Sequence, residues 1–165
     1  SSKEFYARGH QIPNADRNGS DELVVQTYYA TNSTPQIQNK FNGGIWQQLE
    51  SGVRNIAATT DTVYVVTGAI LQTAGNHEAI TWITPKSDSK RCPVPNYYYK
   101  ALLKVRRDAS NKVTSAMTIG FWMEHREYSN DSYTNYATSV AEIELPADIQ
   151  AAAEQNSNWN TFASF

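Results

Sequence analysis

The chain has 165 residues, a length that favours one domain with a substantial core. Hydrophobic residues make up 40% and charged residues 18%, a composition that excludes a disordered chain. A formal net charge of −2 argues against an extensive basic surface, although it leaves room for a local basic cleft. The single cysteine, Cys92, excludes an internal disulfide and a thiolate metal cluster, and we expect it to be a buried or half-buried structural side chain.

Targeting and membrane signals are absent from the sequence. No run of roughly 18 apolar residues is present, so we expect neither a transmembrane span nor a membrane partner. The first residues lack the basic and apolar regions of a signal peptide. The sequence carries no indication of oligomeric state.

The N-terminal quarter predicts short elements separated by turns. Residues 5–11 are led by aromatic side chains and predict an extended segment that carries His10. Residues 13–20 are dense in proline, asparagine, glycine and serine and predict a turn region. Residues 23–29 are rich in β-branched and aromatic residues, which favours a strand, and residues 31–36 predict a loop.

Residues 40–58 give the clearest helical pattern, with Asn42 as the expected N-cap. Helical spacing also places Glu50 and Arg54 along one flank of an apolar stripe. The stripe consists of Ile45, Leu49, Val53 and Ile56. Two glycines in the first turn weaken the helix by roughly 1 kcal/mol each relative to alanine, which suggests close approach of another group there.

The remaining sequence predicts most of a sheet. Residues 63–71 are nearly all apolar and predict a central strand, and residues 80–83 predict a short one. Residues 97–106 and 115–124 predict an antiparallel hairpin, and residues 147–155 a short C-terminal helix. We therefore predict a single α+β domain over residues 1–165, with a mostly antiparallel central sheet and packed helices.

His10 is the histidine with the most suggestive neighbours. Arg8 is two residues away, so both side chains lie on one side of an extended segment, and Gly9 between them allows close approach of a substrate. A guanidinium beside a neutral imidazole suits phosphate chemistry, in which arginine holds the anion and histidine takes a proton from water. Taken alone, a histidine is more often structural. His77 and His125 are assigned as surface or structural residues.

Asn42 could offer its amide oxygen to a metal ion. Mg²⁺ prefers oxygen ligands and keeps most of its waters, so one asparagine with a supporting carboxylate would suffice. Glu50 could hold metal-bound water, and Arg54 could bind a phosphate or form an ordinary i,i+4 salt bridge with Glu50. The simpler interpretation of Asn42 is helix capping alone.

Several ordered segments resemble the DNA/RNA non-specific endonuclease family, whose members are ββα-metal, or His-Me finger, nucleases. The strongest matches lie at residues 8–17, 31–36 and 41–50, followed by Arg54. Further matches lie at residues 63–68, 94–103 and 139–144. A lone Arg-Gly-His would be a weak signal, whereas this ordered set covers most of the chain.

The resemblance implies a ββα-metal finger and a role for each matching residue. His10 matches the general base, Asn42 the one protein ligand of Mg²⁺ (for which Mn²⁺ could substitute), and Glu50 a carboxylate that orients metal-bound water. Arg8 and Arg54 match arginines near the scissile phosphate, and Asn32 matches an asparagine that supports the site. The implied products carry 5′-phosphates.

Two departures from the family pattern stand out. The motif normally reads Asp-Arg-Gly-His, but position 7 is Ala7, either as a natural degeneration or as an engineered change that disables the enzyme. We expect this change to weaken catalysis while leaving the fold intact. Family members also carry a substantial segment before the motif, so we expect the chain to lack an N-terminal segment of the full-length protein.

These observations favour a sugar-non-specific nuclease that acts on the phosphate backbone of single- or double-stranded DNA and RNA. The alternative is a catalytically inactive nuclease fold that binds nucleic acid or a protein partner, and a purely structural domain is a weaker third option. By analogy with the family, we expect a secreted or periplasmic location. Tyr28, Tyr29 and residues 97–99 could stack on bases, although strand tyrosines are more often core or sheet-surface residues.

Overall fold

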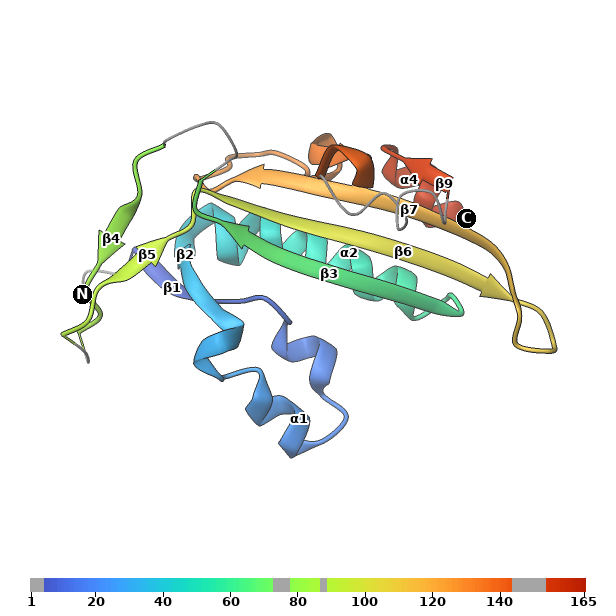
Figure 1. Ribbon diagram of the computed structural model, residues 1–165, viewed down its shortest axis with the longest axis horizontal. Coiled ribbons are helices and arrows are strands. Elements are labelled where there is room, and N and C mark those ends of the chain that lie inside the picture. Colours follow the sequence, from blue (N-terminus) through green and yellow to red (C-terminus); the bar gives the residue numbers. More distant parts are fainter. Residues whose placement is uncertain (1–4, 73–77, 87–88, 144–153) are drawn as a thin grey trace. The chain divides into compact units, whose positions relative to one another are not determined.

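The computed structural model describes residues 5–72, 78–86, 89–143 and 154–165. Helices and mainly antiparallel strands alternate in it, which confirms the predicted α+β class (Figure 1). The chain divides into two compact units, each described here by itself. The first comprises the chain up to Gln47 together with Gly68–Tyr98 and Glu124–Asn130, and the second comprises Gln48–Thr67, Tyr99–Met123 and Asp131–Phe165. The single domain over residues 1–165 stays a prediction.

The first unit is built on two small antiparallel strand pairs. Strand β1 (Tyr6–His10) pairs with β2 (Ser33–Ile37), as Figure 1 shows near the N-terminus. Strand β4 (Thr81–Ile83), which was predicted, pairs with β5 (Cys92–Val94). The connection from β1 to β2 contains η1 (Asn14–Arg17), α1 (Asp21–Gln26) and η2 (Ala30–Asn32).

The predicted strand at residues 23–29 is wrong, because α1 occupies most of it. Ser20 is extended and its hydroxyl accepts a hydrogen bond from the backbone N–H of Leu23 at 3.3 Å. Asp21 and Glu22 follow in the first turn, where carboxylates favour a helix start. This local capping outweighs the strand preference of the β-branched residues. The loop predicted at residues 31–36 is also mostly strand β2.

The predicted helix at residues 40–58 begins later than expected. Helix α2 spans Gln47–Ala57, and the preceding η3 segment (Gln38–Trp46) is wound irregularly. Lys40 in this segment has a φ of 62°, in the left-handed region, and Gly43 and Gly44 also depart from helical angles. Asn42 therefore lies in a connecting segment and is not the N-cap of α2. The poor helix propensity of the two glycines accounts for the late start.

Among the described residues, the larger sheet has five strands. Strand β3 (Thr62–Ile70), β6 (Tyr97–Arg107), β7 (Val113–Glu124) and β8 (Ala137–Thr138) follow in that order, and β9 (Glu154–Asn156) pairs with β7 in parallel. The predicted hairpin is present as β6 and β7. Its turn is held by the carboxylate of Asp108, which accepts hydrogen bonds from the backbone N–H groups of Ser110 and Lys112 at 2.9 and 3.0 Å.

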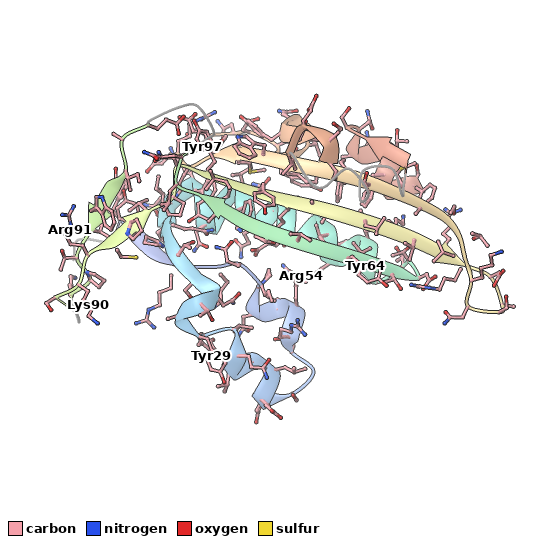
Figure 2. All side chains as sticks on the ribbon, viewed as in Figure 1. Tyr29, Arg54, Tyr64, Lys90, Arg91 and Tyr97 are labelled. Carbon is pink, nitrogen blue, oxygen red and sulfur yellow. The ribbon has the colours of Figure 1, made fainter. Side chains whose placement is uncertain are left out.

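The predicted central position of residues 63–71 is wrong, although the strand itself is confirmed. In the described sheet β3 is the outermost strand, beside β6. Three consecutive apolar side chains on it are exposed, Tyr64, Val65 and Val66 (Tyr64 is labelled in Figure 2). A continuous apolar run therefore does not distinguish a central strand from an edge strand in this chain.

In the second unit, helices pack on the sheet through the predicted apolar stripe of α2. Leu49, Val53 and Ile56 are buried, as expected. The last element is α4 (Trp159–Ser164), in which Phe162 is fully buried. The ring of Trp159 packs against that of Phe121 in β7, with 5.7 Å between the ring centroids.

Two short 3₁₀ turns, η4 (Tyr133–Tyr136) and η5 (Val140–Ile143), flank β8. Of the helix predicted at residues 147–155, residues 147–153 lie outside the described residues, and the remainder belongs to β9. None of the helices in the described ranges has the length and apolar character to cross a membrane.

Candidate active site

Strand β1 presents two different faces to its surroundings. Arg8 pairs with Pro35 and His10 with Ser33, and the alternation along a strand places the Arg8 and His10 side chains on the same face. Ala7 pairs with Gln36 and Gly9 with Thr34, so residues 7 and 9 share the opposite face. Arg8 is exposed and His10 half-buried. The predicted pairing of a guanidinium with an imidazole is therefore geometrically available.

Gly9 is required by the packing of Gln36. A Cβ atom added at Gly9 would lie 2.1 Å from Cδ of Gln36, which is far inside contact distance. The Gln36 side chain is fully buried, and its amide lies beside the hydroxyl of Tyr98. That hydroxyl also bonds to Thr34 Oγ1 at 2.8 Å and to the carbonyl of Pro35 at 3.0 Å. The glycine thus lets β1 pack closely against a buried amide.

The Nε2 atom of His10 is also buried without a hydrogen-bond partner among the described residues. Its imidazole ring meets the ring of Tyr28 edge-on, with 5.6 Å between centroids. An unpaired buried nitrogen costs free energy, and in a native protein such an atom calls for a functional explanation. Because Nε2 is closed off from solvent, Nδ1 is the ring nitrogen of His10 that can meet a water molecule.

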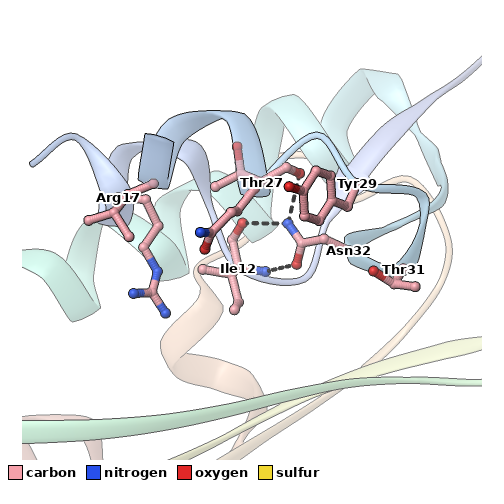
Figure 3. Close-up of a pocket in the computed structure, with 8 residues that line it drawn as sticks. Ile12, Arg17, Thr27, Tyr29, Thr31 and Asn32 are labelled. Carbon is pink, nitrogen blue, oxygen red and sulfur yellow. Dashed lines mark hydrogen bonds between the residues drawn. The ribbon is translucent and has the colours of Figure 1, made fainter. Parts of the chain in front are cut away.

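Asn32 holds the backbone that follows His10 (Figure 3). Its Oδ1 accepts a hydrogen bond from the N–H of Ile12 at 2.9 Å, and its Nδ2 donates to the carbonyl oxygens of Ile12 at 3.0 Å and Thr27 at 2.9 Å. The amide is therefore directed at the backbone. In this structure Asn32 is a positioning residue for the end of β1.

Asn42 is half-buried in the η3 segment, which contacts both β1 and β2. Its Nδ2 donates to Oε1 of Gln38 at 3.1 Å. This bond fixes the orientation of the amide, and the Oδ1 atom accepts no hydrogen bond from any described residue. A carbonyl oxygen held in this way fits a ligand for a hard cation.

A metal site enclosed by protein ligands is absent from the described ranges, since no three His, Cys, Asp or Glu side chains gather there. The residues present instead fit an open site, in which one amide oxygen binds the ion and water and phosphate complete the octahedron. Mg²⁺ commonly binds in this manner because it gives up its waters reluctantly.

Glu50 and Arg54 lie one turn apart on α2 and belong to the second unit. Both are half-buried. Nη2 of Arg54 donates to the hydroxyl of Ser51 at 3.1 Å (Arg54 is labelled in Figure 2). Their predicted roles beside a phosphate and a metal-bound water stay predictions.

Two residues that anchor the site were not identified from sequence. His125 was expected to be a surface or structural residue, and it joins Ile37 at the end of β2 to Pro95 through two hydrogen bonds. Gln38 sets the amide of Asn42. No local pattern marks His125, because its partners are 88 and 30 residues away in sequence. Cys92 is free and half-buried, as expected, and His77 lies outside the described residues.

An antiparallel strand pair with histidine on its first strand, followed by a segment bearing asparagine and then a helix, defines a ββα-type nuclease finger. The profile of the DNA/RNA non-specific endonuclease family matches residues 1–158. The chain belongs to this family, as the sequence motifs predicted.

Named relatives agree with this assignment. The chain is 24% identical over 149 residues to Nuclease 1, mitochondrial, of Schizosaccharomyces pombe, covering 88% of this chain and 45% of that protein. It is 25% identical over 152 residues to the mitochondrial nuclease of Saccharomyces cerevisiae, covering 87% and 43%. It thus spans less than half the length of these curated relatives. The expected secreted or periplasmic location is wrong, because these relatives are named mitochondrial.

A solved structure shows the same fold. The chain superposes on a chain from the crystal structure of the EndoG/EndoGI complex with a TM-score of 0.63 and 20% identity. The superposition covers 93% of this chain and 59% of the other. This likeness confirms the predicted architecture, which includes a nuclease finger.

Proposed function

We propose that this chain forms the catalytic part of a sugar-non-specific endonuclease that hydrolyses phosphodiester bonds of DNA and RNA, single- or double-stranded, and leaves 5′-phosphates. The observation that carries the proposal is the pair on β1, where exposed Arg8 shares a face with half-buried His10. Family membership over residues 1–158 supports the same reaction class. The names of the relatives support a mitochondrial site of action.

Each site residue has a distinct task in this proposal. Arg8 binds the scissile phosphate, and the imidazole of His10 takes a proton from the attacking water. Asn42 would hold Mg²⁺, or Mn²⁺ in its place, through Oδ1, with Glu50 orienting water on the ion and Arg54 binding a phosphate oxygen. The chemistry supplied by the bound ion is Lewis-acid polarisation of the phosphate and stabilisation of the leaving 3′ oxygen.

The recognition of backbone over bases follows from the residue types at this site. Arginine, histidine and an asparagine-held cation interact with phosphate oxygens, which carry no sequence information. The 2′-hydroxyl has no dedicated partner among these residues. DNA and RNA are therefore both substrates in this proposal.

The test is cleavage of supercoiled plasmid and of RNA by the purified protein. We expect nicking with Mg²⁺ or Mn²⁺, loss of activity with EDTA, and at least a hundredfold loss in His10→Ala and Asn42→Ala, within the usual range for a general base. Asn39→Ala, an exposed neighbour of Asn42, is the matched control. Cleavage that survives both EDTA and His10→Ala would refute the mechanism.

Ala7 favours a second candidate function, that of an inactive nuclease fold that binds nucleic acid or a protein partner. It stands directly before Arg8, at the position where the resemblance to the family implies an aspartate. This candidate predicts salt-dependent binding of DNA without turnover, even after Ala7→Asp. The two proposals therefore differ in the cleavage assay of one variant.

A further inference from the structure

An open surface pocket of about 310 Å³ lies directly after the histidine strand, within the first unit (Figure 3). This volume is at the small end of the range for ligand pockets. Its walls come from the segment after β1, from η1 and α1, and from η2. The residues that matter for binding are Ile12, Arg17, Gln26, Tyr29, Thr31 and Asn32.

The polar groups of this cavity divide into two sets. Asn32 and Thr27 are committed, since Asn32 bonds to the backbone and the hydroxyl of Thr27 donates to the carbonyl of Val24 at 2.7 Å. The side chains of Arg17, Gln26, Tyr29 and Thr31 make no hydrogen bond or ion pair with any described residue. The unpaired set contains one cation, one aromatic ring, one amide and one hydroxyl. That is the chemistry needed for a phosphate, a base and a sugar.

The cavity is close to His10 along the chain. Ile12 is two residues beyond His10, so their Cα atoms lie within about 8 Å of each other. Asn32 fixes this part of the wall by bonding both the N–H and the carbonyl of Ile12. A strand whose scissile phosphate sits at His10 therefore passes the cavity within one or two nucleotides.

We propose that this cavity, the Arg17–Tyr29 pocket, binds a nucleotide of the substrate strand that flanks the scissile phosphate. Arg17 holds the flanking phosphate, and the ring of Tyr29, which is 57% exposed, stacks on the base. Stacking on a tyrosine face accepts any base, so the pocket adds affinity without sequence preference. The inference rests on the proposed nuclease function.

The first experiment measures binding in EDTA, so that turnover plays no part. A fluorescein-labelled eight-nucleotide oligo(dT) is titrated with the full chain at several salt concentrations, and anisotropy is recorded. We expect Arg17→Ala to weaken binding about tenfold. It should also reduce the magnitude of the salt slope, the slope of log affinity against log salt concentration, by about 0.7, the value for one phosphate contact on a single strand. Arg17→Lys should leave the salt slope unchanged, because lysine keeps the positive charge that contacts the phosphate. Lys112→Ala, the same charge change at the exposed hairpin turn, is the control and should alter neither quantity.

The second experiment separates the ring from the hydroxyl of Tyr29. Tyr29→Leu should weaken binding about tenfold with an unchanged salt slope, because a base loses its stacking partner while every phosphate contact remains. Tyr29→Phe should bind within twofold of the wild type. Thermal unfolding of each variant checks that the fold is intact.

Cleavage of plasmid by the same proteins, now with Mg²⁺ and without EDTA, separates failure of the pocket from failure of the nuclease function. Weakened oligonucleotide binding in Arg17→Ala and Tyr29→Leu, but not in Lys112→Ala, supports the pocket. Wild-type cleavage with no change of affinity in Arg17→Ala or Tyr29→Leu overturns the pocket and leaves the nuclease function standing. Absence of both cleavage and binding in the wild type and in Ala7→Asp overturns the nuclease function, and the pocket with it.

Discussion

The Nε2 atom of His125 accepts a hydrogen bond from the backbone N–H of Ile37 at 2.8 Å. The other ring nitrogen, Nδ1, lies 2.7 Å from the carbonyl oxygen of Pro95, which can only accept, so Nδ1 carries the proton. The imidazole ring packs against the rings of Phe41 and Tyr98, with 4.9 and 5.1 Å between the ring centroids. His125 is therefore a neutral link that fixes the end of β2, just before the segment that carries Asn42.

This link makes stability depend on pH. Burial lowers the pKa of His125 below its ordinary value of 6.5, and the hydrogen bond to Pro95 offsets part of the effect. Because the folded pKa lies below the unfolded one, the contribution is fully present above pH 6.5 and is lost as the pH falls through the folded pKa. We expect the melting temperature to fall between pH 7 and pH 5, measured by calorimetry.

His125→Gln is the informative variant. Its amide offers one acceptor and one donor but does not titrate, so we expect a shallower loss of stability on acidification than in the wild type. His125→Leu leaves the Ile37 N–H and the Pro95 carbonyl without partners, which should cost about 2–4 kcal/mol at pH 7. A wild-type acid profile that persists unchanged in His125→Gln would show that another group titrates.

Ala7→Asp should raise the cleavage rate. Residue 7 pairs with Gln36 across the two strands, and the side-chain amide of Gln36 is fully buried there. A carboxylate at position 7 could accept from that amide and stiffen the strand that carries His10. We expect a gain of about tenfold in the rate on plasmid, the usual effect of a supporting contact. Ala7→Leu, with similar bulk and no acceptor, is the control, and an equal or lower rate in Ala7→Asp would show that alanine is not the lesion.

Gly9→Ala adds only one methyl group, but it should lower both stability and activity substantially. The new methyl group would overlap the buried side chain of Gln36, so either β1 or Gln36 must move. We expect a loss of about 1–3 kcal/mol in the free energy of unfolding, measured by urea denaturation, together with reduced activity. Gly19→Ala is the matched substitution, since its added Cβ would meet only Cδ1 of Leu23 at 3.9 Å. Equal stability of the two variants would contradict the packing argument.

Gln38→Ala should weaken metal binding without unfolding the protein. Gln38 orients the Asn42 amide, and loss of such a contact typically costs about tenfold in affinity. Titration with Mn²⁺ followed by electron paramagnetic resonance measures the change directly. Asn39→Ala, the exposed neighbour, should bind Mn²⁺ as the wild type does. Identical affinities in all three proteins would remove Gln38 from the metal site.

Periodic patterns predicted the larger elements well. The stripe of Leu49, Val53 and Ile56 identified α2, and two apolar runs around Asp108 identified the β6–β7 hairpin. Both signals arise from burial of one face of a regular element, which leaves its period in the sequence. The motif around His10 also located β1, through its likeness to a family, whereas the partner strand β2 was predicted to be a loop.

Short elements and long-range contacts were not predicted from the sequence. The N-cap at Ser20 stabilises α1 as a helix, although its valines favour a strand. The irregular segment η3 has Lys40 at a φ of 62° and contains the buried side chains of Phe41 and Trp46, and no periodic pattern predicts such a backbone. The link from His125 to Ile37 joins residues far apart in the chain, and no periodicity encodes such a pair.

The ammonium of Lys104 is 3.1 Å from the carbonyl oxygen of Ala163 and 3.4 Å from that of Phe162, at the end of α4. Lys104 is only 5% exposed, and its burial lowers its pKa. A truncation that removes Phe162 and Ala163 would remove these two acceptors and leave the buried ammonium of Lys104 without them. The turn that carries Phe162 and Ala163 is therefore integral to the core, and deleting these two residues should destabilise the protein.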